Sequence, residues 1–86
     1  MRKLTRQTIK PIIHYVRVNV NSGFYNWYHF TLDYYNGKPD FQGGTAYDLD
    51  DCYHYNGKPL DTHALNLQTG EVMDLATKAI VMEVSL

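Results

Sequence analysis

Tyr-Asn-Gly-Lys-Pro occurs twice in the sequence, at Tyr35–Pro39 and again at Tyr55–Pro59. Asn-Gly suits backbone positions with positive φ, which Gly and a few short polar residues occupy at low cost. The proline that follows fixes its own φ and disfavours a helical conformation at the lysine before it. The two copies therefore predict two breaks in the chain, with β-rich segments around and between them.

The segment before the first copy predicts a β-hairpin. Apolar and polar residues alternate over Val16–Val20 and again over Phe24–Tyr35, with a turn signal at residues 21–23 between them. Alternation with a period of two is typical of a half-buried strand. We expect residues 12–20 and 24–35 to form paired strands, and residues 1–11 to form a basic N-terminal segment that is frayed or a short edge strand.

The segment from Thr45 to Gly57 predicts a short helix. Thr45 is a suitable N-cap, the aspartates at 48, 50 and 51 favour the positive helix N-terminus, and Gly57 can end the helix in a left-handed cap. Neighbouring aspartates are disfavoured in strands. In this interpretation the first Asn-Gly opens a loop and the second ends a helix, so the pentapeptide is not a repeated unit of the fold.

Three further strands are expected after the second copy, over residues 60–67, 71–75 and 80–86, with a turn at residues 68–70. The resulting order is ββαβββ. It predicts that residues 1–86 form a single small α+β domain, in which one short helix packs on a face of an antiparallel sheet.

The peptide from Ala64 to Val72 has the sequence Ala-Leu-Asn-Leu-Gln-Thr-Gly-Glu-Val. It resembles the Asn-Leu-x-Thr-Gly-Glu hairpin near the end of many small, uncharacterised phage and prophage proteins. The resemblance covers roughly the last quarter of the chain. It implies a phage-type origin, where small binding proteins that disable host machinery are common, and it carries over no functional residues.

Cysteine content and hydropathy bear on the compartment. Cys52 is the only cysteine, so no disulfide forms within the chain and a reducing compartment is expected. The apolar runs are too short to cross a bilayer, and the N-terminus lacks the apolar stretch of a signal peptide. We expect a cytoplasmic protein without membrane contact, which would lie in the host cytoplasm if a phage encodes it.

Charge is distributed unevenly along a chain whose net charge is only −1. Residues 1–32 hold five lysines and arginines and no acid, whereas residues 33–86 hold three lysines and all nine acids. One interpretation is a basic tail attached to an ordinary acidic domain. The other is a split surface, with one pole for anions and one for a basic partner.

The sequence shows no constellation for catalysis, and we predict a protein that is not an enzyme and holds no metal or cofactor. An EF-hand loop beginning at Asp48 would need Gly where Tyr53 stands and Glu where Pro59 stands. The four histidines lack the spacing of zinc ligands. Cys52 is expected to be a buried, inert thiol.

An acidic, tyrosine-rich segment is the feature that most favours a function. Tyrosine is enriched at protein interfaces, and an acidic surface can occupy a basic groove on a nuclease or polymerase. We therefore expect an inhibitor of a host nucleic-acid-handling or defence protein, such as a CRISPR effector. The same residues would also be explained by a solvated acidic helix. The expected partner-binding residues are Tyr47, Asp48, Asp50, Asp51, Tyr53, Tyr55 and Asp61.

Two other functions are compatible with the pattern. A single-stranded nucleic-acid binder could stack bases on an aromatic strand face and contact phosphates through the basic N-terminus. A homodimer or larger oligomer, such as a structural or virion component, could use the same aromatic face as a subunit contact. The nucleic-acid-binding residues in the first alternative would be Tyr25, Trp27, Tyr35, Arg2, Lys3 and Arg6.

Overall fold

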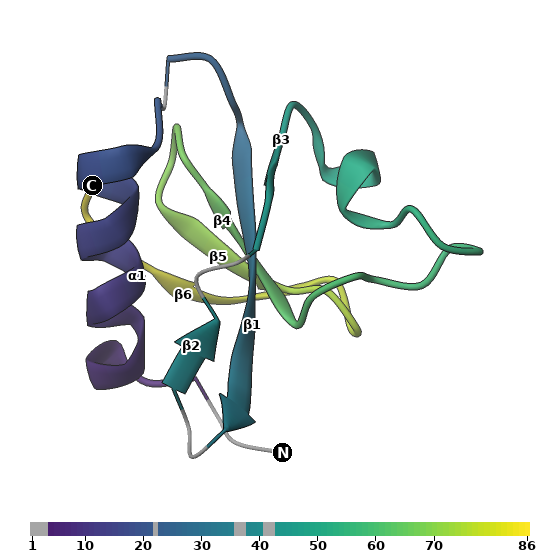
Figure 1. The fold of residues 1–86 in the computed structure, drawn as a ribbon, viewed down its shortest axis with the longest axis horizontal. Helices are drawn as coiled ribbons and strands as arrows, with labels where there is room; N and C mark the ends of the chain where they lie inside the picture. The colour runs from purple at the N-terminus through teal and green to yellow at the C-terminus, as the bar shows by residue number, and fades with distance from the viewer. Residues whose placement is uncertain (1–3, 22, 36–37, 41–42) are drawn as a thin grey trace.

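The computed structural model describes residues 4–21, 23–35, 38–40 and 43–86, and it shows one α-helix beside an antiparallel sheet (Figure 1). The predicted α+β fold class is confirmed. The strands lie in the order β2-β1-β4-β5-β6, and β3 also pairs with β1. The elements are α1 (Arg6–Asn19), β1 (Trp27–Tyr35), β2 (Lys38–Asp40), β3 (Thr45–Ala46), the single 3₁₀ turn η1 (Leu49–Cys52), β4 (His63–Asn66), β5 (Glu71–Asp74) and β6 (Ala79–Glu83).

The helix lies at the N-terminal end of the chain, where the sequence pattern predicted a frayed segment and a strand. Both predictions were wrong from residue 6 to residue 19. Thr5 caps the helix: its hydroxyl accepts from Thr8 N at 3.2 Å, and the Thr8 hydroxyl accepts from Thr5 N at 2.8 Å. Ile9, Ile12 and Val16 then fall on one face and are buried. Burial of this face outweighs the low helix propensity of β-branched residues.

Strand β1 has neighbours on both of its edges. It pairs with β2 and β3 along one edge and with β4 along the other, so the predicted hairpin partner at residues 12–20 is replaced by later parts of the chain. The alternation within β1 is as expected. Tyr28, Phe30 and Leu32 are buried toward α1, and the residues between them face the other way.

The segment from Thr45 to Gly57 is not the helix that was predicted. It contains β3 and only one helical turn, η1. The capping signal is present but begins at Asp48, whose carboxylate accepts from Asp51 N at 3.3 Å. Asn56 and Gly57 then have positive φ, 54° and 73°, and Lys58 N donates to Tyr55 O at 2.9 Å. These angles are those of a two-residue hairpin turn and do not continue a helix.

The repeated pentapeptide has the same pairing in both copies. Tyr35 lies opposite Lys38, and Tyr55 lies opposite Lys58, each in antiparallel register. Asn36 and Gly37 themselves are outside the described residues. The repeat is therefore a repeated unit of strand pairing, contrary to the prediction that it is not a unit of the fold.

The C-terminal strands follow the sequence pattern, with β4, β5 and β6 shorter than predicted at their ends. The Asn66 side chain accepts from the backbone of Gln68 at 2.8 Å and of Thr69 at 3.1 Å, which shapes the turn before β5. Gly70 has a φ of 82°, and a Cβ there would lie 1.9 Å from Val84 O. The Asn-Leu-x-Thr-Gly-Glu hairpin thus has a local physical cause.

The two faces of the sheet are covered differently, by α1 on one side and by the segment after β3 on the other (Figure 1). We call residues 47–61 the acidic loop. The helix-face cluster consists of the buried residues Leu4, Ile9, Ile12, Val16, Tyr28, Phe30, Leu32, Leu65, Leu67 and Val72. The loop-face cluster consists of the buried residues Ala46, Cys52, Ala64 and Leu75, with Trp27, Leu49 and Tyr53 packed against them.

This arrangement places the basic helix and the acidic loop on opposite sides of the sheet. Helix α1 carries Arg6, Lys10 and Arg17 and has no acid, while the acidic loop carries Asp48, Asp50, Asp51 and Asp61 against one lysine. Within the described ranges, no helix is both long and apolar enough to span a membrane.

Candidate protein-binding surface

The acidic loop is fastened to the sheet at its C-terminal end by Asp61. One carboxylate oxygen contacts His29 Nδ1 and the other accepts a hydrogen bond from the Thr31 hydroxyl. His29 and Thr31 are two residues apart on β1, so their side chains project from the same face. The side chains of His29 and Asp61 are only 9% and 12% exposed. Asp61 is therefore a structural anchor between the loop and β1.

Asp61 remains an anion despite its position. Burial raises the pKa of its carboxyl. The hydrogen bonds from His29 and Thr31 and the attraction of His29 lower the pKa by more than burial raises it, so the net pKa lies below the ordinary value. Because the charged form is favoured, the anchor is intact at neutral pH.

A second attachment lies nearer the middle of the loop. The Tyr53 hydroxyl donates to Leu75 O at 3.0 Å, and Lys78 Nζ lies 5.2 Å from the centre of the Tyr53 ring. The backbone closes on itself here, because Leu60 N donates to Cys52 O at 3.2 Å. These contacts hold both limbs of the loop against the sheet.

Cys52 lies within the acidic loop, and its side chain is fully buried against the sheet. Burial raises the pKa of its thiol to about 11, and repulsion from Asp61, Asp51 and Asp48 adds to the shift. A thiol with this pKa is protonated at neutral pH, which disfavours nucleophilic attack. The residue packs in the loop-face cluster, as the sequence predicted for a buried thiol.

The loop presents an exposed set of acidic and tyrosine side chains. Tyr47 is 57% exposed and Tyr55 is 72% exposed, at the two ends of the segment that contains η1. Asp48 and Asp50 are also exposed, and Asp51 is half-buried. Among the residues that the structure describes, no cationic side chain lies within ion-pair distance of these three carboxylates. They are available for a partner of opposite charge.

The seven residues predicted to bind a partner thus have two different positions. Tyr47, Asp48, Asp50 and Tyr55 are exposed, and Asp51, Tyr53 and Asp61 are half-buried. Tyr53 and Asp61 are turned toward the sheet and fasten the loop.

An exposed aromatic group continues this surface toward the connection between α1 and β1. The ring of Tyr47 lies 5.7 Å from that of Tyr25, which lies 6.1 Å from that of Phe24. Phe24 is 61% exposed. The sequence pattern assigned Phe24 and Tyr25 to opposite faces of a strand and so missed their contact. Both residues precede β1, where strand alternation does not apply.

The residues of the nucleic-acid-binding alternative are not gathered on one face. Tyr25 packs against the helix-face cluster, whereas Trp27 packs against the loop-face cluster. Arg6 reaches the C-terminal strand, with Nη1 3.5 Å from Glu83 O. Arg2 and Lys3, and the side chain of Tyr35, lie outside what the structure describes.

The pairing of His29 with Asp61 was missed by sequence reasoning, because 32 residues separate them and no local motif joins them. His29 does stand between the buried aromatic residues Tyr28 and Phe30 in β1. This position predicts that the His29 side chain projects from the face of the sheet opposite those two rings. Across the described ranges, no three His, Cys, Asp or Glu side chains are grouped so that they could hold a metal ion.

No family model matches the chain, and no curated protein or solved structure is significantly similar to it.

Proposed function

We propose that this protein is a non-catalytic, phage-encoded inhibitor that binds another protein through the acidic loop. Its target is a host nucleic-acid-handling or defence protein, such as a CRISPR effector, and it acts in the host cytoplasm. The observation that carries the proposal is the set of carboxylates beside Tyr47 and Tyr55 that form no ion pair with the described residues, on the face of the sheet opposite the basic helix.

The charges support binding to a basic site. A site that binds nucleic acid holds lysines and arginines where phosphates lie, and the carboxylates of Asp48 and Asp50 offer these groups an alternative anion. Complementary charge also speeds the encounter between two proteins. Inhibition should therefore weaken as salt is raised.

The exposed tyrosines supply apolar contact area to the proposed interface, which the carboxylates do not. Tyrosine offers a large, rigid contact area and is among the residues that dominate interface energy. Tyr47 and Tyr55 lie on a loop that Asp61 and Tyr53 already fasten to the sheet. Because that loop is ordered before binding, the entropic cost of association is lower than for a free segment.

A cleavage assay tests the proposal. Purified protein is added to a panel of guide-RNA-loaded CRISPR effector nucleases, and binding and cleavage of target DNA are measured. We expect at least one member to lose DNA binding. The variant Asp48→Asn/Asp50→Asn should raise the concentration needed for half-inhibition about tenfold or more, since it removes two charged contacts. Asn at residue 48 still accepts the capping hydrogen bond from Asp51 N.

The matched control removes two negative charges elsewhere. Glu71→Gln/Glu83→Gln changes β5 and β6 and should leave inhibition within about twofold of the original protein. The proposal is wrong if no member of the panel is inhibited, or if the two double variants behave alike. Quenching of Trp27 fluorescence by an oligonucleotide at low salt would instead favour the nucleic-acid-binding alternative.

A further inference from the structure

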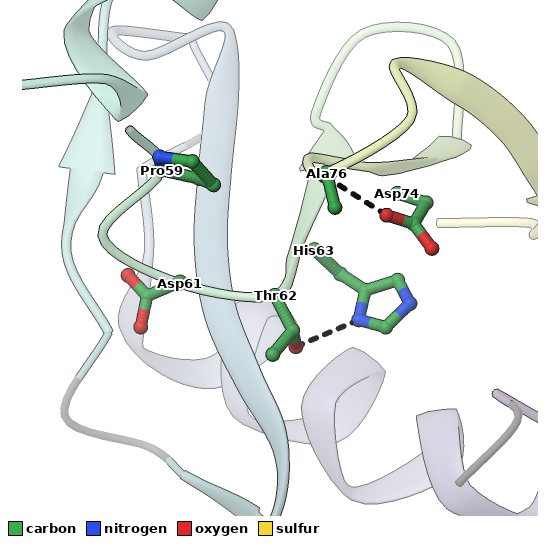
Figure 2. A pocket seen from close by; sticks show the side chains of 6 residues that line it. All are labelled: Pro59, Asp61, Thr62, His63, Asp74 and Ala76. Carbon is green, nitrogen blue, oxygen red and sulfur yellow. Dashed lines mark hydrogen bonds between the residues drawn. The ribbon is translucent and has the colours of Figure 1, made fainter. Parts of the chain in front are cut away.

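A cavity of about 160 Å³ lies at the base of the acidic loop, between the chain that enters β4 and the turn that leaves β5 (Figure 2). This volume is below the roughly 300–1,000 Å³ of sites for drug-sized ligands, so the cavity fits one side chain better than a whole small molecule. The lining residues are Pro59, Asp61, Thr62, His63, Asp74 and Ala76.

Most polar groups around the cavity are already engaged with the protein. The Asp61 carboxylate points away from His63, toward His29 and Thr31 (Figure 2). The Thr62 hydroxyl lies 2.8 Å from His63 Nδ1. The walls are thus formed largely by the carbon atoms of these residues, which suit the apolar stem of a long side chain.

Asp74 supplies the charge at this cavity. Its Oδ1 accepts from Ala76 N at 2.9 Å and from Thr77 N at 3.3 Å, which fixes the carboxylate at the start of the turn. Its Oδ2 accepts no hydrogen bond from the described residues. An ionised carboxylate with one oxygen free is a ready acceptor for a cationic donor.

His63 does not oppose a cation in this position. Its ring is stacked on Phe30, with centroids 5.6 Å apart and planes 16° apart, and the residue is 6% exposed. Burial lowers the pKa of the imidazole, and the opposing attraction of Asp74 does not reverse the shift. The neighbouring cation Lys78 is held over the Tyr53 ring. Asp74 is therefore the charged residue of the lining that has a carboxylate oxygen left for a cation.

We propose that this cavity receives an arginine side chain of the protein partner, with the guanidinium paired to Asp74. The inference rests on the proposed function, and it names one side chain of the partner that the acidic loop binds. Arginine fits better than lysine because its planar guanidinium pairs with carboxylates in two-pronged geometry and is more weakly hydrated than an ammonium group. Basic nucleic-acid-binding sites are rich in this residue.

An NMR titration of the full chain with N-acetyl-L-arginine amide tests the inference. We expect saturable shifts of the His63 ring protons and of the Ala76 and Thr77 amides. The neutral analogue N-acetyl-L-citrulline amide has nearly the same shape and should bind about tenfold more weakly, because a hydrogen bond to a charged group is replaced by a neutral one.

Two variants locate the charge. Asp74→Asn keeps an oxygen for the Ala76 and Thr77 amides but removes the negative charge, and should weaken arginine amide binding about tenfold. Glu83→Gln removes the same charge from the exposed β6 strand and should change it less than about twofold. The inference is overturned by an absence of saturable shifts at His63, by equal shifts with citrulline amide, or by unchanged binding in Asp74→Asn.

The titration also separates this inference from the proposed function. If the arginine amide binds at His63 while no effector is inhibited, the cavity is an arginine site and the inhibitor proposal fails. If an effector is inhibited in an Asp48- and Asp50-dependent way while the arginine amide does not bind, the cavity assignment fails and the loop surface stands.

Discussion

The two faces of the sheet are stabilised by different means. The helix face has a large cluster of aliphatic and aromatic side chains contributed by α1, β1, β4 and β5. The loop face has a small cluster of Ala, Cys and Leu side chains, and polar contacts such as Asp61 with His29 complete the attachment. Apolar burial is non-directional, whereas a buried polar contact stabilises only when its geometry is kept. The helix face therefore supplies stability, and the loop face holds a surface in position.

The two faces also differ in whether their charged side chains are bonded within the molecule. Arg6 and Arg17 of α1 both donate to carbonyl oxygens of the C-terminal segment, so part of the basic side is used within the molecule. Asp48 and Asp50 of the acidic loop have no comparable cationic partner among the described residues. The carboxylates of Asp48 and Asp50 are thus left for another molecule.

The largest effect is expected from the helix face. Phe30→Ala removes a fully buried ring from the centre of β1 and should lower the free energy of unfolding by about 3–5 kcal/mol. Urea unfolding followed by circular dichroism measures this loss. Val18→Ala is the control, because Val18 of α1 is 67% exposed and its replacement should change stability by less than about 0.5 kcal/mol. Equal losses in the two variants would contradict the role of the helix-face cluster.

A smaller effect is expected when the loop anchor is removed. Asp61→Ala leaves His29 and Thr31 without their shared acceptor and should cost about 1–3 kcal/mol. Because Cys52 is buried only while the loop is held against the sheet, the rate of alkylation of Cys52 in the native protein should also rise. Asp50→Ala is the exposed control and should leave the alkylation rate unchanged. A slow, unaltered rate in Asp61→Ala would show that other contacts suffice to hold the loop.

The turn at the tip of the acidic loop gives a purely conformational test. Gly57 has a φ of 73°, and a Cβ there would meet no atom within 4 Å. Gly57→Ala should therefore cost only the strain of a left-handed residue, about 1–2 kcal/mol. Gly70→Ala has a similar φ and an added clash with Val84 O, so its midpoint of urea unfolding should fall further. A lower urea midpoint for Gly70→Ala than for Gly57→Ala checks that Gly57 lies in open space and Gly70 does not.

The smallest effect is the pH dependence contributed by the buried histidine. Burial lowers the pKa of His63 in the folded state, so the unfolded chain binds the proton more readily. The contribution of the neutral His63 side chain to the stability of the fold is complete above the ordinary histidine pKa of 6.5. It is lost as the pH falls below that value. Stability should decline from pH 7 to pH 5, and less so in His63→Phe. The lowered pKa of Asp61 acts in the same direction, but only below its ordinary value of 3.8.

Local patterns predicted the C-terminal half of the fold well. The turn before β5 depends on Asn66 and Gly70, whose roles are encoded within a few residues, and the fold class followed from the strands around it. The sequence pattern did not predict α1, because residue propensity and period-two alternation favour a strand there while burial of one face favours a helix. Val16, Val18 and Val20 alternate as in a strand, yet the spacing of Ile9, Ile12 and Val16 buries one helical face against β1.

The candidate surface was only partly predictable for a related reason. The acidic and tyrosine residues are evident in the sequence, and the exposure of Tyr47 and Tyr55 agrees with a surface role. Which residues fasten the loop depends on contacts across the sheet, since Asp61 meets β1 and Tyr53 meets Leu75. Such long-range contacts leave no periodic signal in the sequence. The cavity beside His63 also arises only when β4 and β5 are paired.

Hydrogen–deuterium exchange of the complex with an inhibited effector is the most direct measurement of where the partner lies. Amides of residues 45–61 should be protected on binding, and those of α1 should exchange as in the free protein. Protection confined to α1, or to the free edge of β6, would contradict the assignment of the acidic loop as the surface that meets the partner.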